Sequence, residues 1–337
     1  MTITIKDIAR ECGVSISAVS LVLNNRPNRI SEKTSALIIE TARSLNYRPN
    51  QIAVSLVTRK TKIIGLILPD ISNVFFAEIG RYVEEEASQA GYTVIYGNTQ
   101  DRIASEFDYI QSFLSKGLSG IILIRSAEQN DEIEEQVKLT IQRAEIPFIF
   151  VDRSYTSINI KNLSVDQING GYIATRHLID NGHKKIACIC GPLHLQVSLD
   201  RLAGYRLAMD EAHISIEPDW IIEGNFRVES GFAAADKIIS KSFTAIFASN
   251  DLMAMGVYQA CFKHRISIPE QLSIVGFDNI IFSSIVSPAL TTIEQPMKQV
   301  CHDACICLIH YIETGKLDST GIIYQPKLIQ RDSTRKI

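Results

Sequence analysis

The sequence has no long hydrophobic run. Its longest apolar stretches, near 63–68 and 146–151, are far shorter than the roughly 20 residues that a transmembrane helix needs. The first residues also lack a basic region followed by a long apolar segment, so we expect no signal peptide. These absences predict a cytoplasmic protein that does not enter a membrane.

Paired cysteines and familiar catalytic motifs are absent too. The seven cysteines include no CxxC pair, which indicates free thiols in a reducing compartment rather than a disulfide framework. The densest group consists of Cys301, His302, Cys305 and Cys307. A metal site is one interpretation of it, but buried cysteines acting as small hydrophobes is the one we favour. No GxxxxGK[ST], HExxH, GxSxG or GxGxxG motif occurs, so we expect no cofactor, no metal and no enzymatic activity.

Charge is distributed unevenly along the chain. Residues 1–60 hold nine Lys and Arg against four Asp and Glu, a net of +5, which leaves −8 for the rest of a chain whose net charge is −3. With 337 residues there is room for two or three domains. A basic head on an acidic body is typical of separate DNA-binding and ligand-binding modules.

The basic head begins with a pattern of two short helices between Thr4 and Asn24. Apolar residues at i, i+3, i+4 and i+7 form one face of the first helix: Ile5, Ile8, Ala9 and Cys12. Thr4 can cap that helix together with Asp7, and Gly13 can end it. Ser15 can cap a second helix, in which Val19, Val22 and Leu23 point inward. This arrangement is typical of a helix-turn-helix, although an αα-hairpin that binds no DNA has the same pattern.

A third helix and a short fourth one follow. Ser31 can cap a helix that runs to about residue 45, with Leu37, Ala42 and Leu45 closing the small core. Pro49 prevents its continuation. Residues 50–57 can form one more helix, which is too short to be stable alone and should fold only when docked.

From residue 63 onward, short apolar strands alternate with amphipathic helices. We predict strands near 63–68, 93–96, 120–124, 148–151, 186–190, 245–247 and 272–277. Helices are expected near 76–89, 102–116, 131–144, 169–180, 198–213, 229–240 and 251–265. Such repeats predict an α/β body with parallel sheets that are covered by helices on both faces.

The strings TIKDIARECGVSISAVSLVLNN and NYRPNQIAVSL, and later SNDLMAMG, VGFDN and PALTTIEQP, closely resemble the LacI/GalR family of bacterial transcription regulators. The resemblance covers nearly the whole chain. It implies an all-α helix-turn-helix head over 1–48, a hinge helix and linker over 49–61, and a periplasmic-binding-protein-like body over 62–337. The N-lobe of that body would comprise about 62–161 and 292–321, and the C-lobe about 162–291 and 322–337.

The same resemblance implies contacts to DNA. The positions that correspond to them are Ser15, Ile16, Ser17, Ser20, Leu21, Asn24, Arg26, Arg29, Asn50 and Leu56. Ile16, Ser17 and Leu21 correspond to the positions that reach base edges in the family. The loop that holds Asn24, Arg26 and Arg29 would contact phosphates, with a solvated surface loop as the alternative. Leu21 stands where relatives often carry a polar or basic residue, which puts the operator sequence in doubt. Leu56 matches a leucine that wedges between base steps in the minor groove; without the resemblance it would be an ordinary buried leucine.

An effector pocket is implied between the lobes. Its matching residues are Phe75, Phe76, Asp152, Arg201, Phe226, Asn250 and Asp278. Aromatic faces, carboxylates, an amide and a guanidinium suit a polyol. Each has a structural alternative: the phenylalanines as core, Asn250 as a helix cap, and Arg201 with Asp278 as an ion pair. Leu195 and Val197 replace residues that are polar or charged in relatives, so we expect a sugar or sugar derivative rather than a purine.

Together these features predict a sequence-specific DNA-binding regulator, most simply a repressor of a carbohydrate-utilisation operon. Its partners would be a palindromic double-stranded operator, a sugar-like effector and a second copy of the chain. A regulator that responds to a non-sugar effector is the alternative, and a solute-binding receptor is a more distant one.

Overall fold

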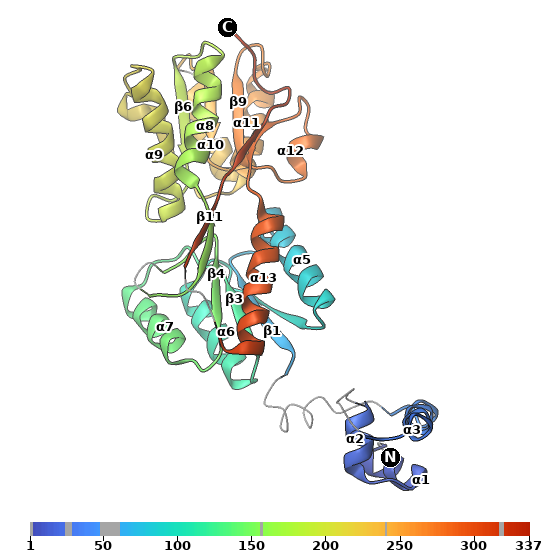
Figure 1. Ribbon diagram of the computed structural model, residues 1–337. Helices are drawn as coiled ribbons and strands as arrows, with labels where there is room; N and C mark the ends of the chain where they lie inside the picture. The colour runs from blue at the N-terminus through green and yellow to red at the C-terminus, as the bar shows by residue number, and fades with distance from the viewer. Residues whose placement is uncertain (1–2, 24–28, 48–60, 156–157, 240, 317–319) are drawn as a thin grey trace. The chain divides into compact units, whose positions relative to one another are not determined.

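The computed structural model describes residues 3–23, 29–47, 61–155, 158–239, 241–316 and 320–337 (Figure 1). The chain divides into two compact units, Met1–Thr61 and Lys62–Ile337, which we describe separately as the head and the body. Among the described residues, no helix is both long and apolar enough to cross a membrane.

In its described part, the head contains α1 (Ile5–Cys12), α2 (Ile16–Leu23) and α3 (Glu32–Ser44). The predicted caps are present. The Thr4 amide donates to the Asp7 carboxylate over 2.9 Å, Gly13 has a φ of 64°, and the Ser15 hydroxyl accepts from the Ala18 amide over 3.1 Å. Ser31 caps α3 by accepting a hydrogen bond from the Thr34 amide over 3.2 Å. Local sequence thus determines where all three helices begin.

The core of the head is small and comes from all three helices. It contains Ile8, Ala9, Val19, Val22, Ile38 and Ala42. The prediction that Leu37 closes this core was wrong, because Leu37 is 47% exposed and Ile38 is fully buried instead. One residue corresponds to about 100° around a helix, so a shift of one position exchanges a buried side chain for an exposed one.

The described residues of the body form two sheets of six strands each. The first has the order β11-β5-β4-β3-β1-β2. Its strands are β1 (Ile63–Leu68), β2 (Thr93–Asn98), β3 (Gly120–Leu123), β4 (Phe148–Val151), β5 (Asn162–Val165) and β11 (Ile322–Tyr324), all paired in parallel. Helices α5 (Val74–Gln89), α6 (Ile103–Ser115), α7 (Asp131–Arg143) and α13 (Met297–Thr314) complete what we call the first lobe.

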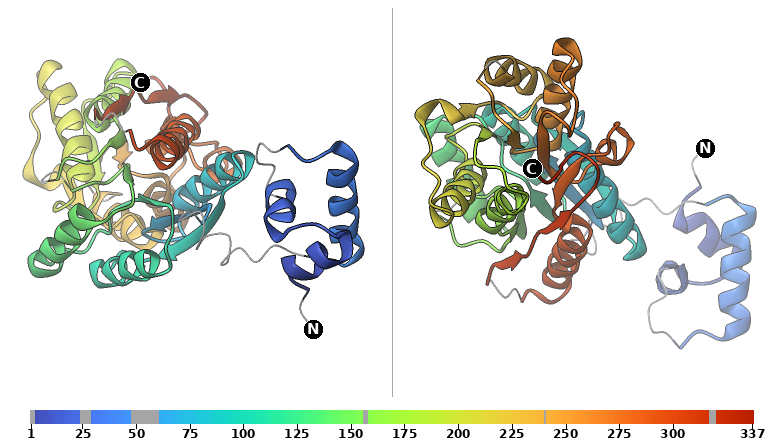
Figure 2. Two further views of the ribbon diagram at one scale, coloured as in Figure 1. Left: turned by 60° about the horizontal axis from the view of Figure 1, so that its bottom comes forward. Right: turned by 90° about the horizontal axis from the view of Figure 1, so that it is seen from above.

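The second sheet has the order β12-β10-β9-β8-β6-β7. Its strands are β6 (Ile186–Cys190), β7 (Ile221–Glu223), β8 (Ala245–Ala248), β9 (Ser273–Asp278), β10 (Thr291–Glu294) and β12 (Lys327–Ile329), of which β12 alone runs antiparallel to its neighbour. The second lobe adds α8 (Gln167–Asp180), α9 (Gln196–Glu211), the 3-10 turn Pro218–Trp220, α10 (Val228–Ile239), α11 (Asp251–His264) and α12 (Phe282–Ile285). Figure 2 gives two further views of the helices around the sheets.

Each sheet is buried on both faces, which explains why its central strands are apolar throughout. Two separate hydrophobic clusters pack against the first sheet and two against the second. A parallel strand that is covered on both sides needs no polar face, so it reads as a continuous run such as IIGLIL in β1. The predicted α/β class with parallel sheets is confirmed.

The chain crosses between the lobes at three places: from β5 to α8, from β10 to α13 and from β11 to β12. Our expected lobe boundaries differ from this at each crossing. Residues 162–165 and 322–324 lie in the first sheet, not in the C-lobe, and 292–294 lie in the second sheet, not in the N-lobe. These segments are strands of three or four residues. Each one belongs to the lobe whose sheet it pairs with, and this pairing is not visible in the local sequence.

Candidate effector cleft and DNA-binding surface

The predicted DNA-contacting residues that the structure describes lie on the outer side of the head. Ser15, Ile16 and Ser17 are exposed at the start of α2, and Arg29 is exposed ahead of α3. Ser20 and Leu21 are half-buried. The remaining predicted contacts lie outside the described residues: Asn24, Arg26, Asn50 and Leu56. The first turn of α2 therefore presents side chains to the solvent, while Val19 and Val22 hold its other face in the core.

In the body, all seven residues predicted for the effector line one cleft between the lobes. Three of them lie at or just beyond the end of a strand: Asp152 directly after β4, Asn250 two residues after β8, and Asp278 at the end of β9. Asn73, Arg153 and Val197 line the same cleft. Its free volume is about 20 Å³, enough for roughly one water molecule, so side chains fill most of the space. The carboxyl ends of parallel strands are where open α/β sheets bind ligands.

Arg201 on α9 is a deeply buried charge of the cleft. It donates from Nε to Gln167 Oε1 over 2.7 Å and from Nη1 to the Ser249 carbonyl over 2.6 Å. The guanidinium lies 3.8 Å from the centre of the Phe277 ring, and Nη1 lies 3.8 Å from Asp278 Oδ1. Burial lowers the pKa of Arg201, opposed by Asp278. Arg201 and Asp278 therefore form the ion pair that was the structural alternative, and both residues also line the cleft.

Asp278 is held from a second side. Gln295 Nε2 donates to Asp278 Oδ1 over 2.7 Å. Burial raises the pKa of Asp278 to about 7, against the opposing influence of Arg201 and Gln295. Sequence reasoning missed Gln167 and Gln295, because nothing in their local pattern distinguishes them from other glutamines.

Asn250 has the structural role that the sequence offered as an alternative, and its contact with an effector stays a prediction. Its Oδ1 accepts from the Met253 amide over 2.9 Å, which caps α11, and its Nδ2 donates to the Phe226 carbonyl over 3.0 Å. Phe226 adopts a left-handed backbone conformation with a φ of 64°, and this carbonyl contact helps to hold it there. The cap thus also fixes the loop that carries an aromatic residue into the cleft.

The first lobe contributes side chains with fewer partners. Phe75 and Phe76 are buried core residues whose rings make an edge contact at 5.3 Å. Asp152 Oδ1 and Arg153 Nε are buried and have no hydrogen-bond partner among the described residues. The Arg153 guanidinium lies 5.3 Å from the Phe76 ring and 5.8 Å from the Phe226 ring, so it bridges the two lobes. Arg153 was not predicted, although its position beside Asp152 after the fourth strand was a usable signal.

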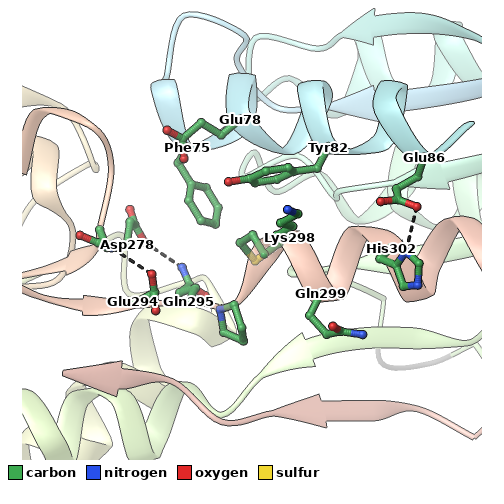
Figure 3. A pocket seen from close by; sticks show the side chains of 13 residues that line it. Phe75, Glu78, Tyr82, Glu86, Asp278, Glu294, Gln295, Lys298, Gln299 and His302 are labelled. Atoms are coloured by element: carbon green, nitrogen blue, oxygen red, sulfur yellow. Dashed lines mark hydrogen bonds and ion pairs between the residues drawn. The ribbon is translucent and has the colours of Figure 1, made fainter. Parts of the chain in front are cut away.

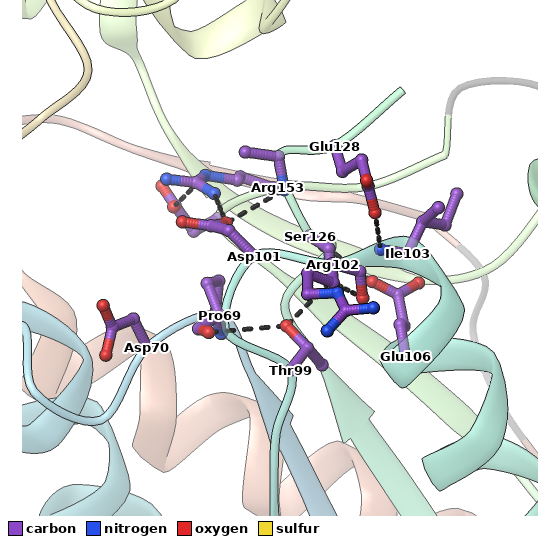
Figure 4. Close-up of polar contacts among 12 residues, drawn as sticks. Pro69, Asp70, Thr99, Asp101, Arg102, Ile103, Glu106, Ser126, Glu128 and Arg153 are labelled. Carbon is purple, nitrogen blue, oxygen red and sulfur yellow. Dashed lines mark hydrogen bonds and ion pairs between the residues drawn. The ribbon is translucent and has the colours of Figure 1, made fainter. Parts of the chain in front are cut away.

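A polar network supports Arg153 at the mouth of the cleft (Figure 4). Asp101 Oδ1 accepts from Arg153 Nη1 and from the Ala127 amide, both over 2.9 Å. Deeper in the first lobe, Glu106 accepts from the Tyr155 hydroxyl over 2.6 Å, and burial raises the pKa of Glu106.

Two contacts cross from lobe to lobe at this mouth. Arg227 Nη2 lies 3.0 Å from Asp70 Oδ2, and His194 Nε2 lies 2.8 Å from the Ala127 carbonyl oxygen. Both pairs join a second-lobe side chain to a first-lobe loop. Together with the small free volume of the cleft, they describe a closed arrangement of the lobes.

A larger cavity of about 480 Å³ lies between α5 and α13 and shares Phe75 and Asp278 with the cleft (Figure 3). Acidic residues dominate its charge, namely Glu78, Glu86 and Glu294. His302 Nδ1 is 2.8 Å from Glu86 Oε2, while Cys301 and Cys305 lie on the buried face of α13 in the core of the first lobe. No cluster of potential metal ligands occurs among the described residues.

The sequence matches two known families. Residues 4–50 match the bacterial regulatory proteins of the lacI family, and residues 175–334 match the periplasmic binding protein-like domain. The HTH-type transcriptional repressor PurR of Vibrio campbellii is 35% identical over 99% of both chains. Catabolite control protein A of Priestia megaterium is 33% identical over 99% of this chain and 100% of its own.

Solved structures give the same picture. The lac repressor dimer bound to operator and the anti-inducer ONPF superposes with a TM-score of 0.88 at 24% identity, covering 99% of this chain and 100% of that one. A LacI-type regulator of Alkaliphilus metalliredigens complexed with D-xylulofuranose has a TM-score of 0.72 at 31% identity, covering 81% of this chain and 99% of that one. A regulator from Enterococcus faecium with bound ribose has a TM-score of 0.72 at 28% identity, covering 82% and 99%.

Proposed function

Since the chain belongs to the LacI family of bacterial regulatory proteins, it is a DNA-binding transcription regulator, and we propose that it is a homodimeric repressor controlled by a small polyol in the cleft. One observation carries the proposal: two buried polar atoms of the cleft, Asp152 Oδ1 and Arg153 Nε, have no hydrogen-bond partner among the described residues. Buried polar groups are nearly always hydrogen-bonded, so these atoms point to a ligand.

Their chemistry selects the class of effector. An ionised carboxylate only accepts hydrogen bonds and a guanidinium only donates them. A hydroxyl group does both, so a sugar can donate one hydroxyl to Asp152 and offer a neighbouring oxygen to Arg153. The rings of Phe76 and Phe226 flank the guanidinium and would cover the apolar face of such a ring.

Two further features support a carbohydrate. Val197 lines the cleft, and its apolar side chain cannot form the hydrogen bonds with which a polar residue at this position would recognise a purine base. Two relatives of solved structure, at 31% and 28% identity, were crystallised with D-xylulofuranose and with ribose. We therefore propose a sugar or sugar derivative as effector, and the genes of its use as the regulated operon.

The proposed DNA side keeps the residues inferred from the resemblance. The start of α2 would enter the major groove, and Arg26 and Arg29 would contact phosphates. A single head buries too little surface for tight specific binding, so we propose a dimer on a palindromic site. Leu56 would act as the minor-groove wedge. Affinity for such a site should fall steeply with salt, because phosphate contacts release counterions.

The test uses the full chain and DNA selected from a randomised palindromic library. Fluorescence anisotropy measures operator affinity alone and with D-ribose, D-xylulose, cellobiose or adenine. We expect one carbohydrate to change the affinity by at least about fivefold, the lower range of allosteric coupling, and adenine to leave it unchanged. A response to adenine and to none of the sugars would contradict the effector class. Failure to select any DNA sequence would contradict the regulator itself.

A further inference from the structure

We propose that Gln167 and Gln295 are positioning residues, which hold Arg201 and Asp278 for the effector and tie both to the crossings between the lobes. The role of Arg201 and Asp278 in binding the effector rests on the proposed function. The hydrogen bonds that link these two residues to Gln167 and Gln295 are observed in the structure and do not depend on it.

The four side chains form a closed ring. Arg201 Nε donates to Gln167 Oε1 over 2.7 Å, Gln167 Nε2 donates to Gln295 Oε1 over 3.0 Å, and Gln295 Nε2 donates to Asp278 Oδ1 over 2.7 Å. The ion pair of Arg201 with Asp278 closes it at 3.8 Å. Gln167 is 5% exposed and Gln295 is 4% exposed, so water does not replace these bonds. Figure 3 shows the Gln295 side chain directed at Asp278.

The chemistry of the two ends fixes the direction of every bond in the ring. A guanidinium has no acceptor, so Arg201 must meet the oxygen of the Gln167 amide. This turns the Gln167 NH2 group toward Gln295, whose oxygen must then face it. The Gln295 NH2 group is left for Asp278, which as a carboxylate can only accept. Either amide therefore has a single correct orientation, and replacing either one disturbs both ends.

The two glutamines sit at the crossings themselves. Gln167 is the first residue of α8, directly after β5 of the first sheet. Gln295 lies between β10 of the second sheet and α13, which packs on α5 in the first lobe. The third crossing also has a glutamine, Gln325, but its oxygen accepts from Asn169 over 2.8 Å and it is exposed and outside the ring.

This placement connects ligand contact with lobe angle. A rotation of the lobes must change the backbone at the crossings, and with it the spacing of the two glutamine side chains. An effector that engages Arg201 or Asp278 then favours the lobe angle at which the ring is intact. A ligand shifts a conformational equilibrium only through such a difference in affinity.

The first test needs no effector. Thermal unfolding of the full chain is compared for wild type and Gln295→Met between pH 5.5 and 8.5. The groups that face Asp278 are Arg201, Asp152, Arg153, Asp251 and Glu294. Because burial raises the pKa of Asp278 to about 7, its carboxyl group is mainly ionised only at the upper end of this range. A hydrogen bond to the ionised form is about twice as strong as one to the neutral form.

We therefore expect Gln295→Met to lower the Tm by about 3 °C or more at pH 8.5, and by less than half of that at pH 5.5. Gln325→Met is the matched control, since it changes a glutamine at the third crossing; its Tm difference from wild type should not depend on pH. In an Asp278→Asn background the pH dependence of the Gln295→Met effect should vanish. A loss of Tm that is equal at both pH values would mean that Gln295 only fills space, and would overturn the ring.

The second test addresses the effector. Calorimetric titration measures binding of D-ribose, D-xylulose and cellobiose to wild type, Gln167→Met, Gln295→Met and Gln325→Met. For the sugar that binds wild type, we expect at least tenfold weaker binding by the two ring variants and unchanged binding by the control. Equal affinity in all four would overturn the positioning role. If wild type binds none of these sugars, the result counts against the proposed function, and the pH series alone decides on the ring.

Discussion

The two lobes prepare their sides of the cleft in opposite ways. In the second lobe, Arg201, Asn250 and Asp278 each make at least one hydrogen bond to a neighbouring group. In the first lobe, Asp152 Oδ1 and Arg153 Nε are buried without a hydrogen bond among the described residues, and Arg153 Nε has only an ion-pair contact of 3.9 Å with Asp152 Oδ2. The second lobe therefore offers a fixed surface, whereas the first offers groups that a ligand must satisfy.

This difference separates stability from affinity. Side chains that are held by neighbours before binding cost little to order when the ligand arrives, so they favour recognition through preorganisation. The unpaired groups contribute most once a ligand meets them, because a buried polar atom without a partner costs about 1–3 kcal/mol. Substitutions in the second lobe should mainly lower stability, and those in the first should mainly lower effector affinity.

The largest effect is expected from a pair of arginine substitutions, one in each lobe. Arg201→Met leaves Asp278 buried without its cation, and breaking a buried pair in this way costs about 3–5 kcal/mol of unfolding free energy. Arg153→Met removes a cation that pairs with Asp101, which is 31% exposed, and that also lies 3.9 Å from the buried Asp152. Because solvent can replace the contact with Asp101, we expect a smaller loss of about 1 kcal/mol. Urea denaturation at pH 8 measures both values.

The pH dependence of Arg201→Met gives an additional check. Without the guanidinium, the pKa of Asp278 rises further above its value in the unfolded chain, so the folded state binds the proton more tightly. The stability of this variant relative to wild type should then fall as the pH rises from 5 to 8. If Arg201→Met and Arg153→Met lower the unfolding free energy equally, the second lobe is not held more firmly than the first, and the proposed difference between the lobes is wrong.

An intermediate effect is expected from Asp152→Asn. The substitution keeps the size of the side chain but removes the charge that would accept a hydroxyl from the effector. A hydrogen bond to a charged group contributes about 1.5–3 kcal/mol, which corresponds to a loss of affinity of roughly 10- to 150-fold. Unfolding free energy should change by less than about 0.5 kcal/mol, because Asp152 Oδ1 has no hydrogen bond to lose and Oδ2 has only the long contact of 3.9 Å with Arg153 Nε.

Asn250→Ala is the comparison from the second lobe. It removes both the cap of α11 and the bond to the Phe226 carbonyl, so it should lower stability by about 1 kcal/mol in addition to any change in affinity. Calorimetric titration with the sugar that satisfies the operator test, together with urea denaturation, measures both quantities. A stability loss in Asp152→Asn as large as that in Asn250→Ala would refute the distinction.

Sequence patterns predicted the parts of the fold in which local physics decides. The strands β1, β4 and β6 have the predicted bounds, because each is a buried apolar run between breaks. The edge and crossing strands β5, β7, β10, β11 and β12 were not predicted as strands. They have three or four residues each, and their pairing partners are distant in sequence.

The cleft shows a similar limit. Residues that match a family motif could be placed after strands, and the structure brings those seven together. Their contact with an effector stays a prediction. Gln167 and Gln295 were beyond reach, since an amide acquires its role only from the guanidinium and carboxylate that folding places at either end.

The smallest effect concerns the contact that joins the two lobes at the mouth of the cleft. Arg227 on the second lobe pairs with Asp70 on the first over 3.0 Å, with the Arg227 side chain 55% exposed. Exposed pairs contribute about 0.2–1 kcal/mol, so Arg227→Gln should speed dissociation of the effector by no more than about fivefold. Added salt should bring wild type toward the variant, because it screens an exposed pair. Stopped-flow measurement of the dissociation rate at low and high salt tests this.

Lys241→Gln is the control, since Lys241 pairs with Asp219 over 2.7 Å within the second lobe and does not cross the cleft. If both substitutions change the dissociation rate equally, the effect comes from net charge, and the pair at the mouth does not help to hold the lobes closed.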